Sequence, residues 1–257
     1  MYTLCGKDRI HPSTDGHLVM AYLFLKAQGL AGKLVADIRI DGAGKKVTRS
    51  DNCRVSDLSV SSDNLTFTYE AKSLPYPIDT SYYDNEKHTQ ADALSVIPFM
   101  DEMNYEGLSV SGLSDGYYGL TIGGEFIGRF TARELERGIN MALLQNTPQY
   151  KQAMKIRQMN EERWLKERKM REFYWVEYNL MRKTGMLWAC DEAAVDTLRK
   201  YRPHDIFLQW NGDLWLQYMH KGIREDCVNE QQDLVDRIYE QNKPIPLQIE
   251  IKKFTDL

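Results

Sequence analysis

The sequence predicts an α+β fold in three consecutive parts: an N-terminal loop and helix, a β-rich region and a mainly helical C-terminal region. Three patterns predict it. Apolar residues recur every three to four positions over 14–28, as on one face of a helix. Apolar and polar residues alternate over 33–71, as in half-buried strands. From Thr147 onward the chain is expected to be nearly all helix, with Pro148 in the first helical turn, and we expect boundaries at 1–30, 31–130 and 131–257.

The first helix is expected over 14–28, with a residue of 13–15 as its cap and Gly29 at its end. Its buried stripe is expected to consist of Leu18, Ala21, Tyr22 and Leu25. Strands then follow at "LVADIRI", "LSV" and "LTFTYEA", with "DGAGKK" as a hairpin turn. Two prolines exclude "SLPYPID" from the interior of a sheet.

A helix is expected near 89–104, with Pro98 as a kink or boundary. A second group of strands follows at "LSVSGL", "YYGLTI" and "EFIGRF", separated by the turn residues "SDG" and "GG". The two groups of strands are expected to form a small sandwich or a single mixed sheet. Thr131 and Glu134 have the spacing of a capping box, which predicts a helix start.

One long helix is expected over 149–183, and two more over 191–201 and 223–242. The long helix is expected to be supported by the i,i+4 pairs Glu162/Lys166 and Glu167/Arg171. Its mixed basic, acidic and aromatic residues are typical of a solvated helix with one core stripe. The tail "KPIPLQIEIKKF" is expected to be a further strand or simply extended.

Composition excludes some classes of function. The chain is 42% hydrophobic and 27% charged with a net charge of −4, so binding to bulk nucleic acid is disfavoured. No apolar run reaches the roughly 18 residues of a membrane span. The four cysteines form no C-x-x-C, which disfavours zinc or redox pairs and favours unpaired thiols. The opening "MYTLCGKDRI" has no signal-peptide pattern, and the compartment is not predicted.

The segment "GKDRIHPSTDGH" carries the candidate chemistry. Pro12 holds His11 out of the helical region, and a helix begins directly afterwards. Asp8, three residues earlier, can accept a hydrogen bond from one ring nitrogen and leave the other free to act as a base. Two alternatives stay open: Asp8 caps a turn beside a surface histidine, or both residues bind a metal with His17. The second lacks the H-E-x-x-H spacing, so no metal or other cofactor is predicted.

"KDRIHPSTDGHLVMAYLFLKAQGL" resembles the last conserved block of the SGNH (GDSL-type) hydrolases, in which a D-x-x-H-P element and then G-H precede a helix. The resemblance implies that residues 1–30 end a flavodoxin-like α/β domain. It makes Asp8 and His11 the catalytic Asp and His of a serine esterase, and it gives His17 a supporting role in the loop. The later segments "LTFTYEAKSLPYPID", "QADALSVIPF" and "LTIGGEFIGRFTARELERGINMALLQNTPQYKQA" resemble the long C-terminal extension of a bacterial subgroup.

The sequence departs from this family because it contains no G-D-S. The family places its serine and oxyanion-hole residues ahead of the histidine block, so we expect a truncated chain that is inactive alone. The implied substrate is a carboxylic ester, such as an acylated carbohydrate or another small ester, and the parent enzyme is expected to be periplasmic or secreted. The alternative function is a non-catalytic binding or scaffold protein that uses the β-rich region and the aromatic segment 209–220. Oligomeric state is not predicted.

Overall fold

The computed structural model describes residues 2–6, 8–81 and 88–254. Its contacts divide the chain into two compact units. The sandwich unit consists of Met1–Lys155 and Asn242–Leu257, and the helical unit of Ile156–Gln241. The predicted α+β class is confirmed, with a β-rich region followed by a helical C-terminal region. The three domain ranges with boundaries at 30 and 130 stay a prediction.

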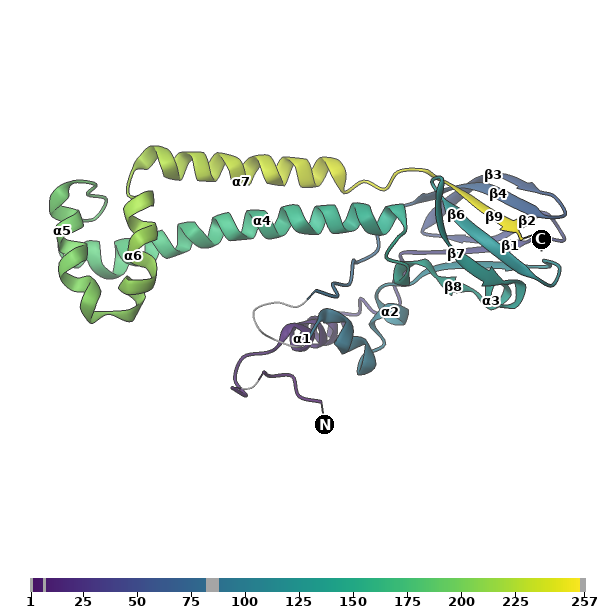
Figure 1. The fold of residues 1–257 in the computed structure, drawn as a ribbon, viewed down its shortest axis with the longest axis horizontal. Helices are drawn as coiled ribbons and strands as arrows, with labels where there is room; N and C mark the ends of the chain where they lie inside the picture. Colours follow the sequence, from purple (N-terminus) through teal and green to yellow (C-terminus); the bar gives the residue numbers. More distant parts are fainter. Residues whose placement is uncertain (1, 7, 82–87, 255–257) are drawn as a thin grey trace. The chain divides into compact units, whose positions relative to one another are not determined.

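The sandwich unit contains nine strands and several short helices among its described residues (Figure 1). In chain order they are α1 (Thr14–Ala27), β1 (Ala36–Asp41), β2 (Lys46–Asp51), β3 (Cys53–Val60), β4 (Asn64–Ala71), the 3₁₀ helix η1 (Gln90–Ser95), α2 (Phe99–Glu102), β5 (Glu106–Ser111), β6 (Tyr117–Ile122), β7 (Glu125–Thr131), α3 (Ala132–Arg137), β8 (Ile139–Asn140), the 3₁₀ helix η2 (Met141–Leu143) and β9 (Leu247–Lys253).

The strands form two sheets, in the orders β2-β1-β5-β8 and β3-β4-β9-β6-β7. Only β1 and β5 run parallel among the described pairs. Each predicted group of strands therefore contributes to both sheets. The C-terminal tail is a strand, β9, and it occupies the centre of the five-stranded sheet. The tail thus closes a sheet whose other strands lie more than a hundred residues earlier.

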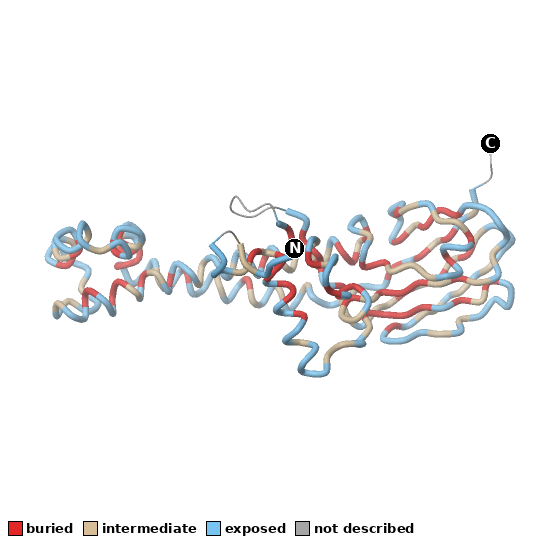
Figure 2. Tube along the Cα trace, turned by 90° about the horizontal axis from the view of Figure 1, so that it is seen from below, coloured by how far each residue is buried: buried red, intermediate tan, exposed pale blue. Residues whose placement is uncertain are grey.

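The core of the sandwich unit lies between the sheets, and buried residues follow the strands in Figure 2. In β4 the alternate residues Leu65, Phe67 and Tyr69 are almost completely buried, whereas their neighbours are partly exposed. The same period of two puts Ile249 and Ile251 of β9 into the core. Alternation in the sequence therefore predicts which face of the five-stranded sheet is covered.

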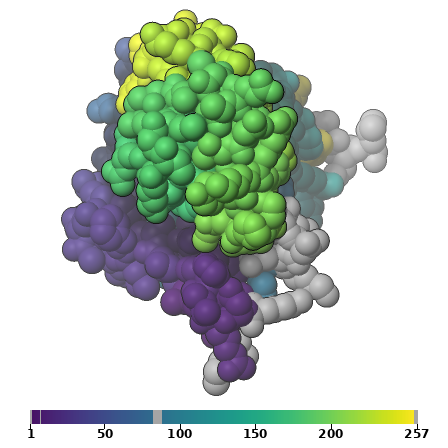
Figure 3. All heavy atoms as spheres, turned by 90° about the vertical axis from the view of Figure 1, so that its left-hand side faces the viewer, coloured from purple at the N-terminus to yellow at the C-terminus, as the bar shows by residue number. Residues whose placement is uncertain are grey.

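The helical unit is built on a helical hairpin with two shorter helices at one end, which face the viewer in Figure 3. Its elements are most of α4 (Pro148–Val176), the π-helical turn η3 (Glu177–Met181), α5 (Glu192–Tyr201), the 3₁₀ helix η4 (Arg202–His204), α6 (Ile206–Tyr218) and α7 (Lys221–Gln241). Phe173 and Trp215 are fully buried in its core. The helices expected over 149–183, 191–201 and 223–242 are confirmed, and α6 is an additional helix.

The expected close contact between Glu162 and Lys166 is not formed, although, beside the hydrogen bond with Glu230, the charge of Glu162 still helps to raise the pKa of Lys166. Lys166 reaches across to α7 instead, where its Nζ lies 2.6 Å from Glu230 Oε2. The pair Glu167/Arg171 is present at 3.7 Å. A contact to a neighbouring helix therefore replaces one of the two contacts that the spacing along α4 predicts.

The helix expected near 89–104 is two short helices, η1 and α2. Thr89 and Asp92 form a capping box that starts η1, and Pro98 is the residue before α2. The proline therefore acts as a boundary, because its ring is incompatible with an uninterrupted helix.

Helix α1 buries one side against η1 and leaves another side exposed. Leu18, Val19 and Tyr22 belong to a cluster that includes residues of η1 and α2. The expected stripe is right for Leu18 and Tyr22 and wrong for Ala21 and Leu25, which are exposed or only partly buried. The exposed apolar side chains of α1 are Met20, Leu23 and Phe24.

All four cysteines are free thiols, as expected, and Cys53 and Cys227 are buried. Among the described residues, no helix combines the length and the apolar character needed to cross a bilayer.

Candidate active site

Asp8 and His11 lie in a short closed loop that precedes α1. The backbones of Cys5 and Pro12 form an antiparallel bridge across the base of this loop. Inside it, the N–H of Gly6 donates to the carbonyl of His11 at 2.8 Å. Arg9, at the tip, adopts the left-handed conformation with φ 58°. The described residues of this loop therefore place two functional side chains together.

The side chains of Asp8 and His11 face each other. Asp8 Oδ2 lies 2.6 Å from His11 Nδ1. Asp8 Oδ1 accepts hydrogen bonds from the backbone N–H groups of Ile10 and His11, each at 3.0 Å. The carboxylate is thus fixed by its own loop, and it holds the imidazole through one nitrogen. The contact that the sequence predicted is present.

Hydrogen bonding stabilises the charged form of this carboxylate. The bond with the His11 ring, followed by those from the two backbone N–H groups, lowers the pKa of Asp8 from 3.8 to about 2. Asp8 is therefore ionised throughout the neutral range. The His11 side chain is 83% exposed and that of Asp8 is 48% exposed. The far nitrogen of His11, Nε2, is accessible from outside.

Gly16 explains how the loop reaches the helix. A Cβ at this position would collide with the backbone carbonyl oxygen of Leu4. That same oxygen accepts a hydrogen bond from the Ser13 N–H at 3.2 Å. The first strand-like residues therefore cross directly over the start of α1, and only glycine permits the approach.

A buried carboxylate that sequence reasoning did not single out lies beneath the loop. Asp15 is 1% exposed and accepts a hydrogen bond from Ser13 Oγ. Its Oδ2 lies 3.7 Å from Nδ1 of His88. Burial, and then the nearby charge of Asp15, raises the pKa of Tyr2 to about 12. Asp15 had been expected only as a cap residue, and no local pattern links it to His88, which lies far along the chain.

His17 does not join the pair. Its side chain is exposed on the first turn of α1, and its backbone N–H donates to the Ser13 carbonyl. Over the described part of the chain, no group of three or more His, Cys, Asp and Glu side chains is arranged to hold a metal ion. Among the same residues, no serine hydroxyl contacts the ring of His11.

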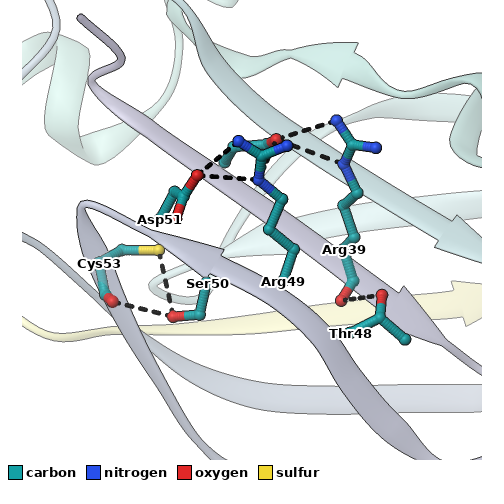
Figure 4. A network of polar contacts seen from close by, with 7 residues as sticks. Arg39, Thr48, Arg49, Ser50, Asp51 and Cys53 are labelled. Atoms are coloured by element: carbon teal, nitrogen blue, oxygen red, sulfur yellow. Dashed lines mark hydrogen bonds and ion pairs between the residues drawn. The ribbon is translucent and has the colours of Figure 1, made fainter.

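The charged cluster on β1 and β2 is structural (Figure 4). The buried Asp37 accepts from Arg39 at 3.1 Å and pairs with Arg49 at 3.0 Å. Arg49 also binds Asp51. The strand register places Asp37 opposite Asp51 and Arg39 opposite Arg49. The diagonal ion pair between Arg49 and Asp37 offsets the repulsion within both of these like-charged pairs.

Glu106 is the other acidic group with a strongly altered environment. It is completely buried on β5, where it accepts from Tyr69 Oη at 2.8 Å and from Gln149 Nε2 at 3.3 Å. Burial raises its pKa from 4.5 to about 7, against the opposing effect of these hydrogen bonds. Because Tyr69 belongs to the other sheet, Glu106 ties the two sheets together from inside the core.

The aromatic segment 209–220 mainly packs between helices. Trp215 is fully buried and donates from its Nε1 to Glu177 Oε1 at 2.8 Å. Trp210 is 67% exposed, with its ring 5.4 Å from that of Phe207. Trp215, Tyr218 and Met219 of this segment therefore belong to the core of the helical unit, whereas Trp210 does not.

Comparison with known proteins gives two matches. Residues 154–243 match the model of the diltiazem deacetylase C-terminal helical domain, a range that nearly coincides with the helical unit. The solved structure of BT4096, a gut microbial diltiazem-metabolizing enzyme, is similar over 98% of this chain with 41% identity and a TM-score of 0.92. The match spans 57% of that enzyme's chain. No curated protein matches.

Proposed function

We propose that this chain supplies the Asp–His part of a Ser-His-Asp machinery that hydrolyses carboxylic esters. His11 Nε2 takes the proton of a serine hydroxyl as the serine oxygen bonds to the acyl carbon. It then returns that proton to the leaving alcohol when the ester C–O bond breaks. Water repeats the cycle on the acyl-serine and releases the acid. Asp8 holds the ring and stabilises the imidazolium.

One observation carries this proposal: Asp8 Oδ2 lies 2.6 Å from His11 Nδ1, and the opposite ring nitrogen is exposed. The two backbone N–H groups form a turn cap on Asp8 Oδ1, and this orientation presents the other oxygen, Oδ2, to the ring of His11. The low pKa of Asp8 keeps the orienting group charged at any pH at which a histidine can act as a base.

The nucleophile in this proposal belongs to protein outside this sequence. We assign residues 1–30 to the end of an SGNH-type hydrolase domain, whose serine and oxyanion hole would face His11. The exposed apolar residues Met20, Leu23 and Phe24 of α1 support this assignment, because such a surface is normally covered. The partial coverage of the diltiazem-metabolizing enzyme is consistent with it. The chain alone is then inactive toward esters.

The comparisons support the class of reaction. A deacetylase removes an acetyl group, and the helical unit resembles the C-terminal helical domain of a diltiazem deacetylase. Acetyl transfer from an oxygen to water is the chemistry that a serine, His11 and Asp8 would perform together. We propose a small ester or an acylated carbohydrate as the natural substrate.

The test is a chimera. The part of the diltiazem-metabolizing enzyme outside the match is joined to this chain, and p-nitrophenyl acetate hydrolysis is measured. We expect activity in the chimera, a loss of at least about 10³-fold in His11→Ala, and no activity in the chain alone. His17→Ala is the matched control and should retain activity. An active His11→Ala chimera, or hydrolysis by the isolated chain above its His11→Ala variant, would contradict the proposal.

The alternative is a non-catalytic binding or scaffold protein. The exposed aromatic rings on the sandwich unit favour it, because they are not explained by ester hydrolysis. Under this alternative, the chimera has no hydrolytic activity that depends on His11.

A further inference from the structure

We propose that the outer face of the five-stranded sheet binds an acidic sugar residue, in a hollow between β6, β7 and β9. This surface lies on the sandwich unit and does not depend on the proposed ester hydrolysis. The hollow has a volume of about 320 Å³, at the lower end of the range for small-molecule sites. It is lined by Gly119, Thr121, Phe126, Glu250, Lys252, Lys253 and Phe254.

The strand register brings the lining residues together. Gly119 lies between Arg129 on β7 and Lys252 on β9. One pair further along, Thr121 lies between Phe126 and Glu250. The alternate residues of β6 and β9 are buried in the core, so these side chains belong to the solvent face. Two adjacent rows therefore present cations, an acid, a hydroxyl and aromatic rings to one spot.

The aromatic rings form the walls. Phe126 is 59% exposed and Phe254 is 42% exposed, with their centroids 6.5 Å apart and their planes at 80°. Both rings lie over Gly119, where an added Cβ would come within 3.4 Å of each. Aromatic rings that cover a strand glycine can serve the structure alone. That role does not explain the polar residues around these rings. The apolar C–H face of a pyranose ring could pack on their exposed surface.

The charged residues in and beside the hollow favour an acidic ligand. Within the described part of the chain, Lys252 and Glu250 make no ion pair, whereas Lys253 is occupied by a bond to Ser114 Oγ at 2.7 Å. Beside the hollow, the guanidinium of Arg129 lies 3.8 Å from the centroid of the Tyr117 ring and 5.2 Å from that of the Phe254 ring, so it makes cation–π contacts with both. Arg129 and Lys252 together outweigh Glu250 and complement one carboxylate.

The remaining polar groups favour a sugar over a nucleic acid. Glu250 would repel a phosphate backbone, but its carboxylate accepts hydrogen bonds from sugar hydroxyls. The Thr121 hydroxyl can donate or accept in the same way. A uronic acid residue offers all three features: an apolar ring face, hydroxyls and one carboxylate.

Binding to an oligogalacturonate is measured by calorimetry on the whole chain, with a neutral galactose oligomer and polyglutamate as comparisons. We expect saturable binding to the oligogalacturonate that is roughly tenfold tighter than to either comparison, a difference of about 1.4 kcal/mol. Phe126→Ala and Lys252→Gln should each weaken it by about tenfold or more. Both sites are exposed, and circular dichroism checks their folding.

Trp210→Ala, an equally exposed aromatic in the helical unit, is the matched control and should bind as the unaltered chain does. The proposal is overturned by an absence of saturable binding, by unchanged binding in Phe126→Ala, or by binding to polyglutamate or oligothymidylate that is as tight as binding to the oligogalacturonate. Oligothymidylate is titrated in the same way as a phosphate-backbone comparison. These outcomes do not depend on whether any chimera hydrolyses esters.

Discussion

The loop around Asp8 and the core around Glu106 shift the pKa of a carboxyl group in opposite directions. Asp8 is exposed, is surrounded by donors and has its pKa lowered to about 2. Glu106 is buried, and burial outweighs its hydrogen bonds and raises its pKa to about 7. The first is a permanent charge beside an accessible histidine, whereas the second bonds groups from the other sheet and from α4. The surroundings of each carboxyl group therefore distinguish Asp8, the candidate orienting carboxylate of the site, from Glu106, which is structural.

The largest expected effect is on catalysis. In the active chimera, Asp8→Asn should lower kcat by about 10³- to 10⁴-fold, because an amide cannot hold the correct tautomer of His11 or stabilise its charged form. Glu106→Gln is the contrasting variant and should leave kcat unchanged. Initial rates with p-nitrophenyl acetate measure both. Equal losses in the two variants would mean that the comparison between the carboxyl groups is wrong.

The next effect concerns stability and pH. A raised pKa means that the folded chain keeps Glu106 protonated while the unfolded chain ionises it. The free energy of unfolding should therefore fall as pH rises from about 4.5 to about 7, by on the order of 3 kcal/mol. Glu106→Gln should remove most of this slope. Urea unfolding at pH 5 and pH 8 measures it, and an identical slope in both proteins would exclude Glu106 as its source.

A smaller effect should follow from Gly16→Ala. The added methyl group collides with the Leu4 carbonyl, so the loop must move off α1 at a cost of about 2 kcal/mol. We expect a loss of activity in the chimera together with faster proteolysis of the N-terminal loop. Gly222→Ala in α7 is the control, because its Cβ meets no atom within 4 Å. If both variants behave alike, the packing of the loop on α1 is not important.

The smallest effect is expected for the cap of α3. Thr131→Ala removes the hydroxyl that accepts from the Glu134 N–H at 3.1 Å, and it should cost about 1 kcal/mol of stability. Thr131→Ser keeps the hydroxyl and should cost much less. Thermal unfolding distinguishes them. A Ser variant as unstable as the Ala variant would mean that the methyl group, not the cap, is important.

Local patterns predicted much of this molecule because local forces decide those parts. The period of 3.6 predicts α1, Pro148 and the i,i+4 charge spacing predict α4, and the capping box at Thr131 predicts where α3 begins. Asp8 and His11 meet within one loop, so their spacing suggested the contact, although it also left a turn cap beside a surface histidine and a metal site open. Pro98 was correctly suspected as a boundary, although the sequence could not say that short helices lie on both sides of it.

Contacts between distant residues could not be predicted in this way. β9 lies between β4 and β6 only because the chain returns after the whole helical unit. His88 contacts Asp15, which lies more than seventy residues earlier in the sequence, and Lys166 pairs with Glu230 on another helix. Glu106 gives no local sign that it is buried, since its environment is made by the other sheet and by α4. Each of these depends on tertiary packing rather than on spacing.

The central claim is that Asp8 fixes His11 with its Nδ1 protonated and its Nε2 free for a serine proton. Long-range ¹H–¹⁵N NMR of the isolated chain, at a pH high enough for a neutral ring, reads this tautomer directly. We predict that His11 carries its proton on Nδ1, and that Asp8→Asn shifts the population toward Nε2. A ring protonated mainly on Nε2 in the unaltered chain, or a tautomer that Asp8→Asn does not change, would contradict the account.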